Sequence, residues 1–476
     1  MKILNKQINF VDLIRYSYLL IFITMFAMTI TNYKSNVILY IIYSSVVLYC
    51  LLLSSKRQTK IFIFFVFFFL FFGLWFKLSI NSFTNFKYLA NTGNFFKSNY
   101  VFDINDLDVV VQISMFSFLF FYLPLLIPNA KKKIFQFKNQ EKNILSFYFK
   151  NEKYLLIFIS IILITIPIIN IIFSFYQKGL VPEKKNVYFF FNFWINYFAP
   201  CLISYLIYLS FRNNNYKFFF IILIEPTLSA ISTFSRWVVL IYYVYFIGFI
   251  KSQIIFKKKY IYLFLLGSII FTIVSNFNVY QTRENRFKKA AEEYGTLLEN
   301  KKVHEIEINN YFKNIIFNRF LGVDGIMAVI TSNNQSFKNL SMSFKSDDIF
   351  KDSSFYEKKY LFISSNDNEA FLKKNITSQN SPGIIAYLLF SGSHIFLYTV
   401  IFIISFVLLK LENILNILFK NKIFISVIMF HLVYKIFHFG FSPSNSYKFL
   451  IGISICIISP ILVNKLLGSF SWKKIK

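Results

Sequence analysis

The sequence predicts an all-α polytopic membrane protein with about twelve transmembrane helices and one large external loop between the ninth and tenth. Composition is the first observation: 56% of the 476 residues are hydrophobic and 21% are aromatic, and the mean hydropathy is +0.54. Soluble domains rarely reach such values. The second is that continuous apolar runs approach the roughly 20 residues that cross a bilayer, whereas strands of a membrane barrel would alternate. The third is that Lys and Arg gather in the short segments between these runs.

The formal net charge of +29 is distributed as a membrane topology requires. Cytoplasmic connections of membrane proteins are enriched in Lys and Arg, and the basic residues here follow that pattern. The chain has no basic helix or folded basic domain that would bind a polyanion, so no nucleic-acid partner is expected. Phe is abundant throughout, and we expect its rings to face mainly lipid.

The first four spans alternate in direction, starting from a cytoplasmic N-terminus. The loop 81–108 is polar and slightly acidic and is expected outside, whereas the strongly basic segment 131–153 is expected inside. The four spans are predicted at about 14–30, 36–53, 61–80 and 109–127.

The middle of the chain holds one unusual apolar segment, 218–250, which is interrupted at Ser235-Arg236. It is too short for two full spans with a loop, and it suits two short helices that meet at Arg236 near the external surface. The remaining spans are predicted at 154–175, about 189–211, 260–277, 384–409, 423–439 and about 449–466, the tenth kinked at Ser391-Gly392-Ser393. Both termini are then cytoplasmic.

The predicted organisation is a membrane domain over 1–279, an external loop over 280–383, and a second membrane segment over 384–476. The loop is the one long polar part of the chain. Within it, the stretch from Arg319 to Val329 mixes apolar residues with few charges. This composition indicates a segment that packs against the membrane domain.

Arg236 is the most informative single position. An arginine at the centre of a bilayer costs about 2.5–3.5 kcal/mol on insertion scales, and such residues are functional by default. Its partner would be an anion at the level of the lipid headgroups, such as a phosphate or a pyrophosphate, which guanidinium binds through two parallel hydrogen bonds. The alternative is an arginine at the membrane edge whose side chain extends to water.

Three further arginines belong to the external loop. Arg283 and Arg286 are three residues apart, and on a helix continuing from span nine they would share a face. Arg319 opens the apolar stretch described above. For each of them, a structural ion pair with a nearby acid is the alternative to a role in binding.

Other ionisable residues fall inside predicted spans. Glu225 lies in span seven and is a candidate partner for Lys435. In span eleven, His431, Lys435 and His438 have the spacing that lines one helical face, which indicates a cavity or a helix contact. His394 lies at the external end of span ten. Four histidines with no metal-ligand spacing predict no metal site.

Three stretches give the chain a resemblance to the bacterial O-antigen and capsule repeat-unit polymerases of the Wzy type. The segment Ser232-Thr233-Phe234-Ser235-Arg236-Trp237 resembles the short Ser-Arg motif that this family has between two spans. The second stretch is Arg319 to Val329, early in the external loop. The third is 381–393, followed by Tyr434-Lys435 and 439–443. Where the family pattern has Gly beside the Ser-Arg motif and Arg after Tyr434, this chain has Phe234, Trp237 and Lys435.

The resemblance implies a glycosyltransferase of the bacterial inner (cytoplasmic) membrane with a periplasmic loop. Such an enzyme moves a growing glycan from undecaprenyl diphosphate onto a hydroxyl of an incoming undecaprenyl-diphosphate-linked repeat unit. Its partners would be undecaprenyl-diphosphate-linked glycans, membrane lipid and a chain-length regulator protein. The resemblance implies no cofactor and no metal.

The chemistry of such a transfer assigns roles to the residues above. Negative charge develops on the leaving diphosphate and needs fixed cations. A base must take the proton of the acceptor hydroxyl. The cations are Arg236 and Arg319, with Arg283, Arg286, Lys435 and His438 as diphosphate-binding or substrate-binding groups. Asp324, His394 and Glu225 are the candidates for the base, and the sequence does not rank them.

Three other functions are compatible with this topology. An O-antigen ligase shares the large external loop and transfers glycan to lipid A core instead. A flippase or exporter of lipid-linked sugars would have no large external insert and more intramembrane charge. A structural or scaffolding membrane protein is the third alternative.

The topology yields a first prediction. A reporter enzyme fused near Asn334 reads as external, because the charge pattern places 280–383 outside. A matched fusion within 131–153 reads as cytoplasmic. A cytoplasmic signal near Asn334 would overturn the predicted topology.

Overall fold

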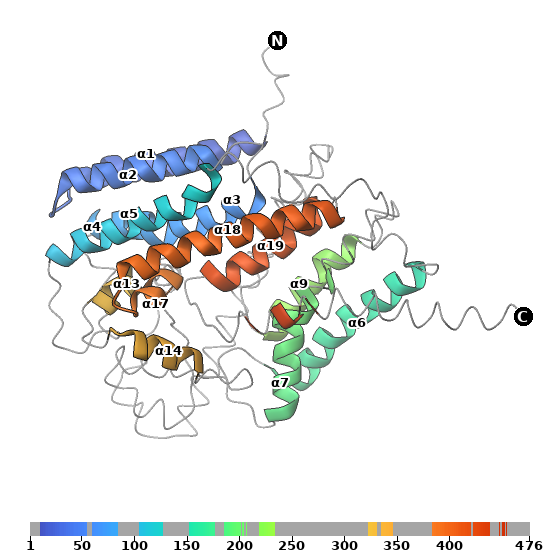
Figure 1. Ribbon diagram of the computed structural model, residues 1–476. Coiled ribbons are helices and arrows are strands. Elements are labelled where there is room, and N and C mark those ends of the chain that lie inside the picture. The colour runs from blue at the N-terminus through green and yellow to red at the C-terminus, as the bar shows by residue number, and fades with distance from the viewer. Residues whose placement is uncertain are drawn as a thin grey trace, which may run out of the picture. The chain divides into compact units, whose positions relative to one another are not determined.

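In the computed structural model (Figure 1), every secondary-structure element within the described ranges is a helix, which confirms the predicted all-α class. The described residues are 10–54, 60–83, 104–126, 152–176, 185–200, 202, 203, 206, 219–233, 322–330, 335–345, 383–419, 422–437, 447, 450–452 and 454. The chain divides into two compact units. Unit 1 comprises Met1–Gln140, Lys313–Ile414 and Leu432–Tyr447, and unit 2 comprises Glu141–Phe312, Leu415–His431 and Lys448–Lys476.

Five helices in the described part of the chain are long and apolar enough to cross a membrane. They cover Val37–Ser54, Ile61–Phe83, Asp106–Leu126, Leu156–Phe173 and His394–Ile417. These findings support an α-helical membrane protein. The count of twelve spans, the sides of the membrane and the boundaries at 280 and 383 stay predictions. Span nine and most of span twelve lie outside the described residues.

The N-terminal part of unit 1 follows the first four predicted spans to within a few residues. Its helices are α1 (Phe10–Ile30), α2 (Val37–Ser54), α3 (Ile61–Leu70), the π-helix η2 (Phe71–Phe76), α4 (Lys77–Phe83) and α5 (Ile104–Leu126). The span Ile61–Phe83 consists of α3, η2 and α4, which form one continuous helix. We call it the central helix.

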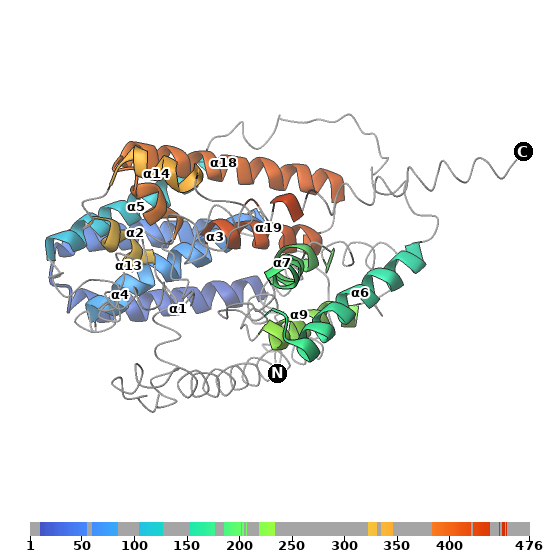
Figure 2. The same cartoon turned by 90° about the horizontal axis from the view of Figure 1, so that it is seen from below.

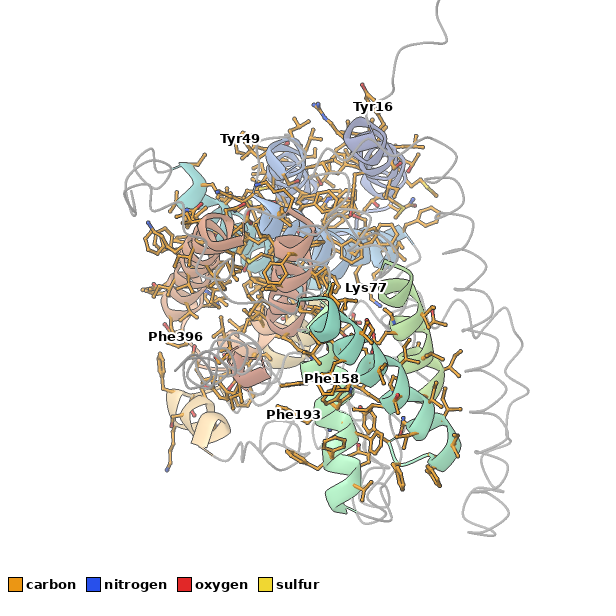
Figure 3. The ribbon with its side chains drawn as sticks, turned by 90° about the vertical axis from the view of Figure 1, so that its right-hand side faces the viewer. Tyr16, Tyr49, Lys77, Phe158, Phe193 and Phe396 are labelled. Carbon is orange, nitrogen blue, oxygen red and sulfur yellow. The ribbon has the colours of Figure 1, made fainter. Side chains whose placement is uncertain are left out.

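The central helix is buried on nearly all sides, as expected for a helix that is apolar around its whole circumference. Phe62, Phe65, Phe67 and Phe71 are each at most 1% exposed. The expectation that phenylalanine faces mainly lipid is therefore wrong for this helix. The outer face of the unit instead belongs to α1 and α2, whose Tyr16 and Tyr49 are 63% and 49% exposed (Figure 3).

Hydrogen bonds between α2 and the central helix give their relative direction. The hydroxyl groups of Tyr40 and Ser79 are 2.8 Å apart, and Trp75 Nε1 donates to Ser44 Oγ at 3.0 Å. The later residue of α2, Ser44, thus contacts the earlier residue of the central helix, Trp75. The two helices are antiparallel, as the predicted alternation of spans two and three requires.

The C-terminal part of unit 1 returns beside these helices. It contains α17 (Ile384–Leu389), most of α18 (His394–Phe419) and the end of α19 (Lys422–Phe437). Near the end of α18, the Glu412 carboxylate accepts the backbone N–H groups of Ile61 and Phe62 at 3.0 Å each. These donors lie at the start of α3 and have no partner within that helix. Glu412 thus caps the central helix from a neighbouring one.

The relative direction of α5 and α18 tests the number of crossings between them. Tyr398 packs its ring against Phe116 and Phe120, and Ser405 Oγ donates to Phe121 O at 2.6 Å. Residues further along α18 contact residues further along α5, so the two helices are parallel. If both cross the membrane, an odd number of crossings lies between them, in agreement with the five predicted.

The start of predicted span ten differs from the prediction. The expected kink at Ser391-Gly392-Ser393 is a complete break: α17 ends at Leu389 and α18 begins at His394. Gly392 has a φ of +75°, which glycine adopts without strain. The backbone N–H of Ser336 donates to Phe390 O at 2.9 Å and attaches part of the polar segment 280–383 to this break. The apolar span therefore begins at His394.

Unit 2 contains predicted span five and the first parts of spans six and seven. Its helices are α6 (Glu152–Phe173), α7 (Lys185–Phe193), the π-helix η5 (Trp194–Phe198) and α9 (Phe219–Thr233), and α6 packs along α9. Asn170 Nδ2 donates to Ser232 O at 3.2 Å, and Asn170 Oδ1 accepts the N–H of Tyr176 at 2.8 Å. The side chain of Asn170 thus joins α6 to both α9 and its own following turn.

The cap on the central helix generates a prediction. Glu412→Ala lowers the free energy of unfolding by about 3 kcal/mol, because two buried N–H groups lose a charged acceptor. Glu412→Gln, which keeps one acceptor oxygen, loses less. Unfolding of the detergent-solubilised protein by SDS measures both, with Ser45→Ala on the exposed face of α2 as control. Equal stability of Glu412→Ala and Ser45→Ala would contradict the assignment.

Candidate functional site

A short helix from the polar segment 280–383 and the short helix that directly follows this segment meet inside unit 1. Helix α13 (Gly322–Ile330) packs against α17, α5, η2 and α4. Figures 1 and 2 show α13, α17 and the following helix α14 (Phe337–Lys345) together at the end of the unit where α4 ends and α18 begins. The apolar residues of α13 are at most 1% exposed: Val323, Ile326, Met327 and Val329. The prediction that this stretch packs against the membrane domain is confirmed over 322–330.

The first residue of α13 touches the middle of the central helix. A Cβ atom on Gly322 would lie 2.5 Å from the backbone oxygen of Gly73, closer than real Cβ atoms come. The absence of a Cβ atom on Gly322 therefore lets the two backbones approach directly. Because Gly73 lies at the middle of the span Ile61–Phe83, α13 runs alongside the second half of that span. The loop thus reaches the level of the membrane-spanning bundle.

One turn further on, a buried ion pair joins the same two helices. Lys77 Nζ lies 3.3 Å from Asp324 Oδ2, and the two side chains are 1% and 4% exposed. Lys77 is the first residue of α4 and directly follows η2; Figure 3 shows it inside the unit. Sequence reasoning identified Asp324 and missed Lys77. The signal was present, because Lys77 is a lone cation in the apolar run 61–80.

The two carboxylate oxygens of Asp324 differ in their surroundings. Oδ2 faces the Lys77 ammonium, whereas Oδ1 is buried and accepts no hydrogen bond from the part of the chain that the structure describes. Burial raises the pKa of Asp324 to about 6, and the neighbouring Lys77 opposes this rise. The site therefore holds a carboxyl group whose pKa is raised to about 6 and whose Oδ1 has no hydrogen-bond partner among the described residues.

The other candidate bases have different surroundings. His394 is exposed at the first position of α18, with its ring centroid 6.3 Å from that of Tyr398. Glu225 is buried in α9 of unit 2, where it accepts a hydrogen bond from Ser229 Oγ at 2.5 Å. The contact found for Glu225 is therefore with its own helix.

Most of the predicted cationic site residues lie outside the described ranges. Lys435 is half-buried in α19, with Nζ 5.7 Å from the ring centroid of Tyr434. The predicted site residues outside the described ranges are Arg236, Arg283, Arg286, Arg319 and His438. Within those ranges, no three His, Cys, Asp or Glu side chains gather as a metal-binding group.

Comparison with known proteins gives no relative: no protein-family model, curated protein or solved structure matches the chain. The function of the chain is therefore inferred from its residues and from the geometry around α13.

The contact between Gly73 and Gly322 generates a prediction. Gly322→Ala lowers the free energy of unfolding by about 1–3 kcal/mol, because the new methyl group meets backbone that cannot rotate away. Gly383→Ala is the matched control, since a Cβ there meets nothing within 4 Å. SDS unfolding measures both variants. If the two alanines have the same effect, α13 does not dock as described.

Proposed function

We propose that the chain is a polymerase of lipid-linked polysaccharide repeat units in a bacterial inner membrane. In this proposal it transfers the growing glycan from undecaprenyl diphosphate to a hydroxyl of an incoming undecaprenyl-diphosphate-linked repeat unit. One observation carries the proposal furthest: a helix of the polar loop enters the bundle of apolar helices and brings a buried carboxylate to the second half of a candidate membrane span. One oxygen of this carboxylate has no hydrogen-bond partner in the part of the chain that the structure describes. A reaction between two lipid-linked substrates needs reacting groups at that level.

The proposed reaction is a displacement at the anomeric carbon of the growing glycan. The acceptor hydroxyl oxygen forms the new glycosidic bond to this carbon. The bond from the carbon to the diphosphate oxygen breaks, and undecaprenyl diphosphate leaves with the electron pair. The hydroxyl proton passes to a carboxylate base. Charge on the leaving diphosphate is stabilised by fixed cations.

Among the three candidate bases, the geometry favours Asp324. A base works best when its pKa lies near the operating pH, and the pKa of Asp324 is raised to about 6. Glu225 already accepts a hydrogen bond on its own helix, and His394 is exposed at a helix start. Since Oδ1 is covered, substrate binding must open the packing over α13 before the acceptor hydroxyl reaches it.

The roles of the cations come from the resemblance alone. We propose Arg236 and Arg319 as the groups that stabilise the leaving diphosphate. The proposed binding groups beside them are Arg283, Arg286, Lys435 and His438. The periplasmic side of the loop, a metal-independent reaction and a chain-length regulator as partner belong to the same proposal.

Deletion of the gene in the native bacterium tests the function, with surface glycans analysed by electrophoresis. Loss of the ladder with single-repeat glycans retained is the expected result. Loss of all attached glycan would instead indicate a ligase or a flippase. An unchanged ladder would contradict the proposal.

The same assay tests the principal cation. Arg236→Ala, expressed in the deletion strain, gives the single-repeat pattern while the protein still reaches the membrane, because the leaving diphosphate loses its guanidinium partner. Arg212→Ala, on the predicted cytoplasmic side, restores the ladder. Normal glycan length with Arg236→Ala would remove Arg236 from the site.

A further inference from the structure

The buried ammonium of Lys77 has no role in the function proposed so far. We propose that Lys77 is a positioning residue for Asp324: it holds Oδ2 and leaves Oδ1 to accept the proton of the acceptor hydroxyl. This inference rests on the proposed polymerase function and extends it to a residue of the central helix. The distance of 3.3 Å between Nζ and Oδ2, with both side chains almost fully buried, is the observation behind it.

Stability alone does not account for this pair. Removing two charges from water largely offsets their attraction, and replacing a buried pair with apolar residues is often neutral or stabilising. The best-attested benefit of such pairs is that they select one packing arrangement over others. The ion pair therefore indicates that the Asp324 carboxylate has to be held in one position.

The local backbone is built to place Lys77 at this point. A π-helical turn holds more residues than an α-helical turn, so η2 rotates the helix that follows it. Lys77 is the first residue after this segment. Two residues before Asp324, Gly322 is held against Gly73. The glycine contact fixes the level of α13 along the central helix, and the ion pair fixes its rotation.

Lys77 is also the charge that acts on Asp324. Within the described residues, the elements packed against α13 carry other charged or titratable groups, namely Asp106, Asp108 and Tyr122 on α5 and Tyr387 on α17. Burial raises the pKa of Asp324, and among the described residues Lys77 is the one group whose charge changes that pKa further. The ammonium lowers that pKa, so it favours the carboxylate that serves as a base.

Full-length protein in nanodiscs tests this role, with undecaprenyl-diphosphate-linked repeat units extracted from the deletion strain as substrate. Lys77→Met lowers kcat at least tenfold with little change in KM. The wild-type rate rises with pH through a midpoint of about 6, as Asp324 ionises. In Lys77→Met this midpoint moves up by roughly one pH unit or more, because the carboxyl has lost its cation. A merely structural lysine would not move the midpoint.

Three further variants distinguish a positioning role of Lys77 from a role in folding alone. Lys77→Gln keeps a hydrogen-bond donor without the charge and shows the same shift if Lys77→Met does not fold. Lys77→Arg keeps the cation, so its midpoint stays near that of the wild type. The neutral pair Lys77→Met with Asp324→Leu unfolds at the same SDS concentration as the wild type but makes no polymer.

The outcomes distinguish the two proposals. A wild-type protein that makes no polymer from these substrates contradicts the polymerase function. An active wild type with unshifted midpoints in Lys77→Met and Lys77→Gln contradicts the positioning role. Polymer formation by the neutral pair at the wild-type rate would remove both Lys77 and Asp324 from the reaction.

Discussion

The arrangement of unit 1 depends on the contact between α13 and the central helix. Gly322 lies directly on Gly73, and Asp324 pairs with Lys77 one turn further along. Neither contact is possible unless this part of the polar segment 280–383 enters the bundle. The first N–H and last C=O groups of so short a helix have no partners within it and must be covered by protein at this level, because lipid offers no hydrogen-bond partners. The surrounding helices α4, α5 and α17 provide that cover and make α13 part of the membrane unit.

This contact places ionisable side chains from the loop and from the central helix beside each other within an apolar bundle. The central helix supplies a rigid apolar support, with a cation near one end. The loop supplies a carboxylate whose pKa burial has raised. An enzyme that joins two lipid-linked sugars needs polar groups fixed at the level of its lipid carriers, because a group on a freely moving loop would lose the geometry of attack. The proposed polymerase satisfies this requirement through packing, and the cap that Glu412 places on α3 keeps the support itself in place.

Much of the fold could be predicted because apolar runs bounded by charges define spans with little ambiguity. The first four spans and their alternating directions follow from that pattern alone, as does the packing of the stretch that contains Asp324. Lys77 was missed because a lone lysine late in an apolar run also fits a side chain that extends to the membrane surface. The π-helix η2 has no sequence signal, and glycine with serine at 391–393 is compatible with either a kink or a break. The partner of Asp324 is a tertiary contact that no local pattern encodes.

A double-mutant cycle on Lys77 and Asp324 tests the central claim most directly. The free energy of unfolding in SDS is measured for the wild type, Lys77→Met, Asp324→Leu and the variant that carries both substitutions. If the two side chains form a buried pair, each single substitution is destabilising and the double one much less so, with a coupling free energy of about 2 kcal/mol or more. A coupling near zero would show that α13 does not dock on the central helix through this pair, and the account of the site would fail with it.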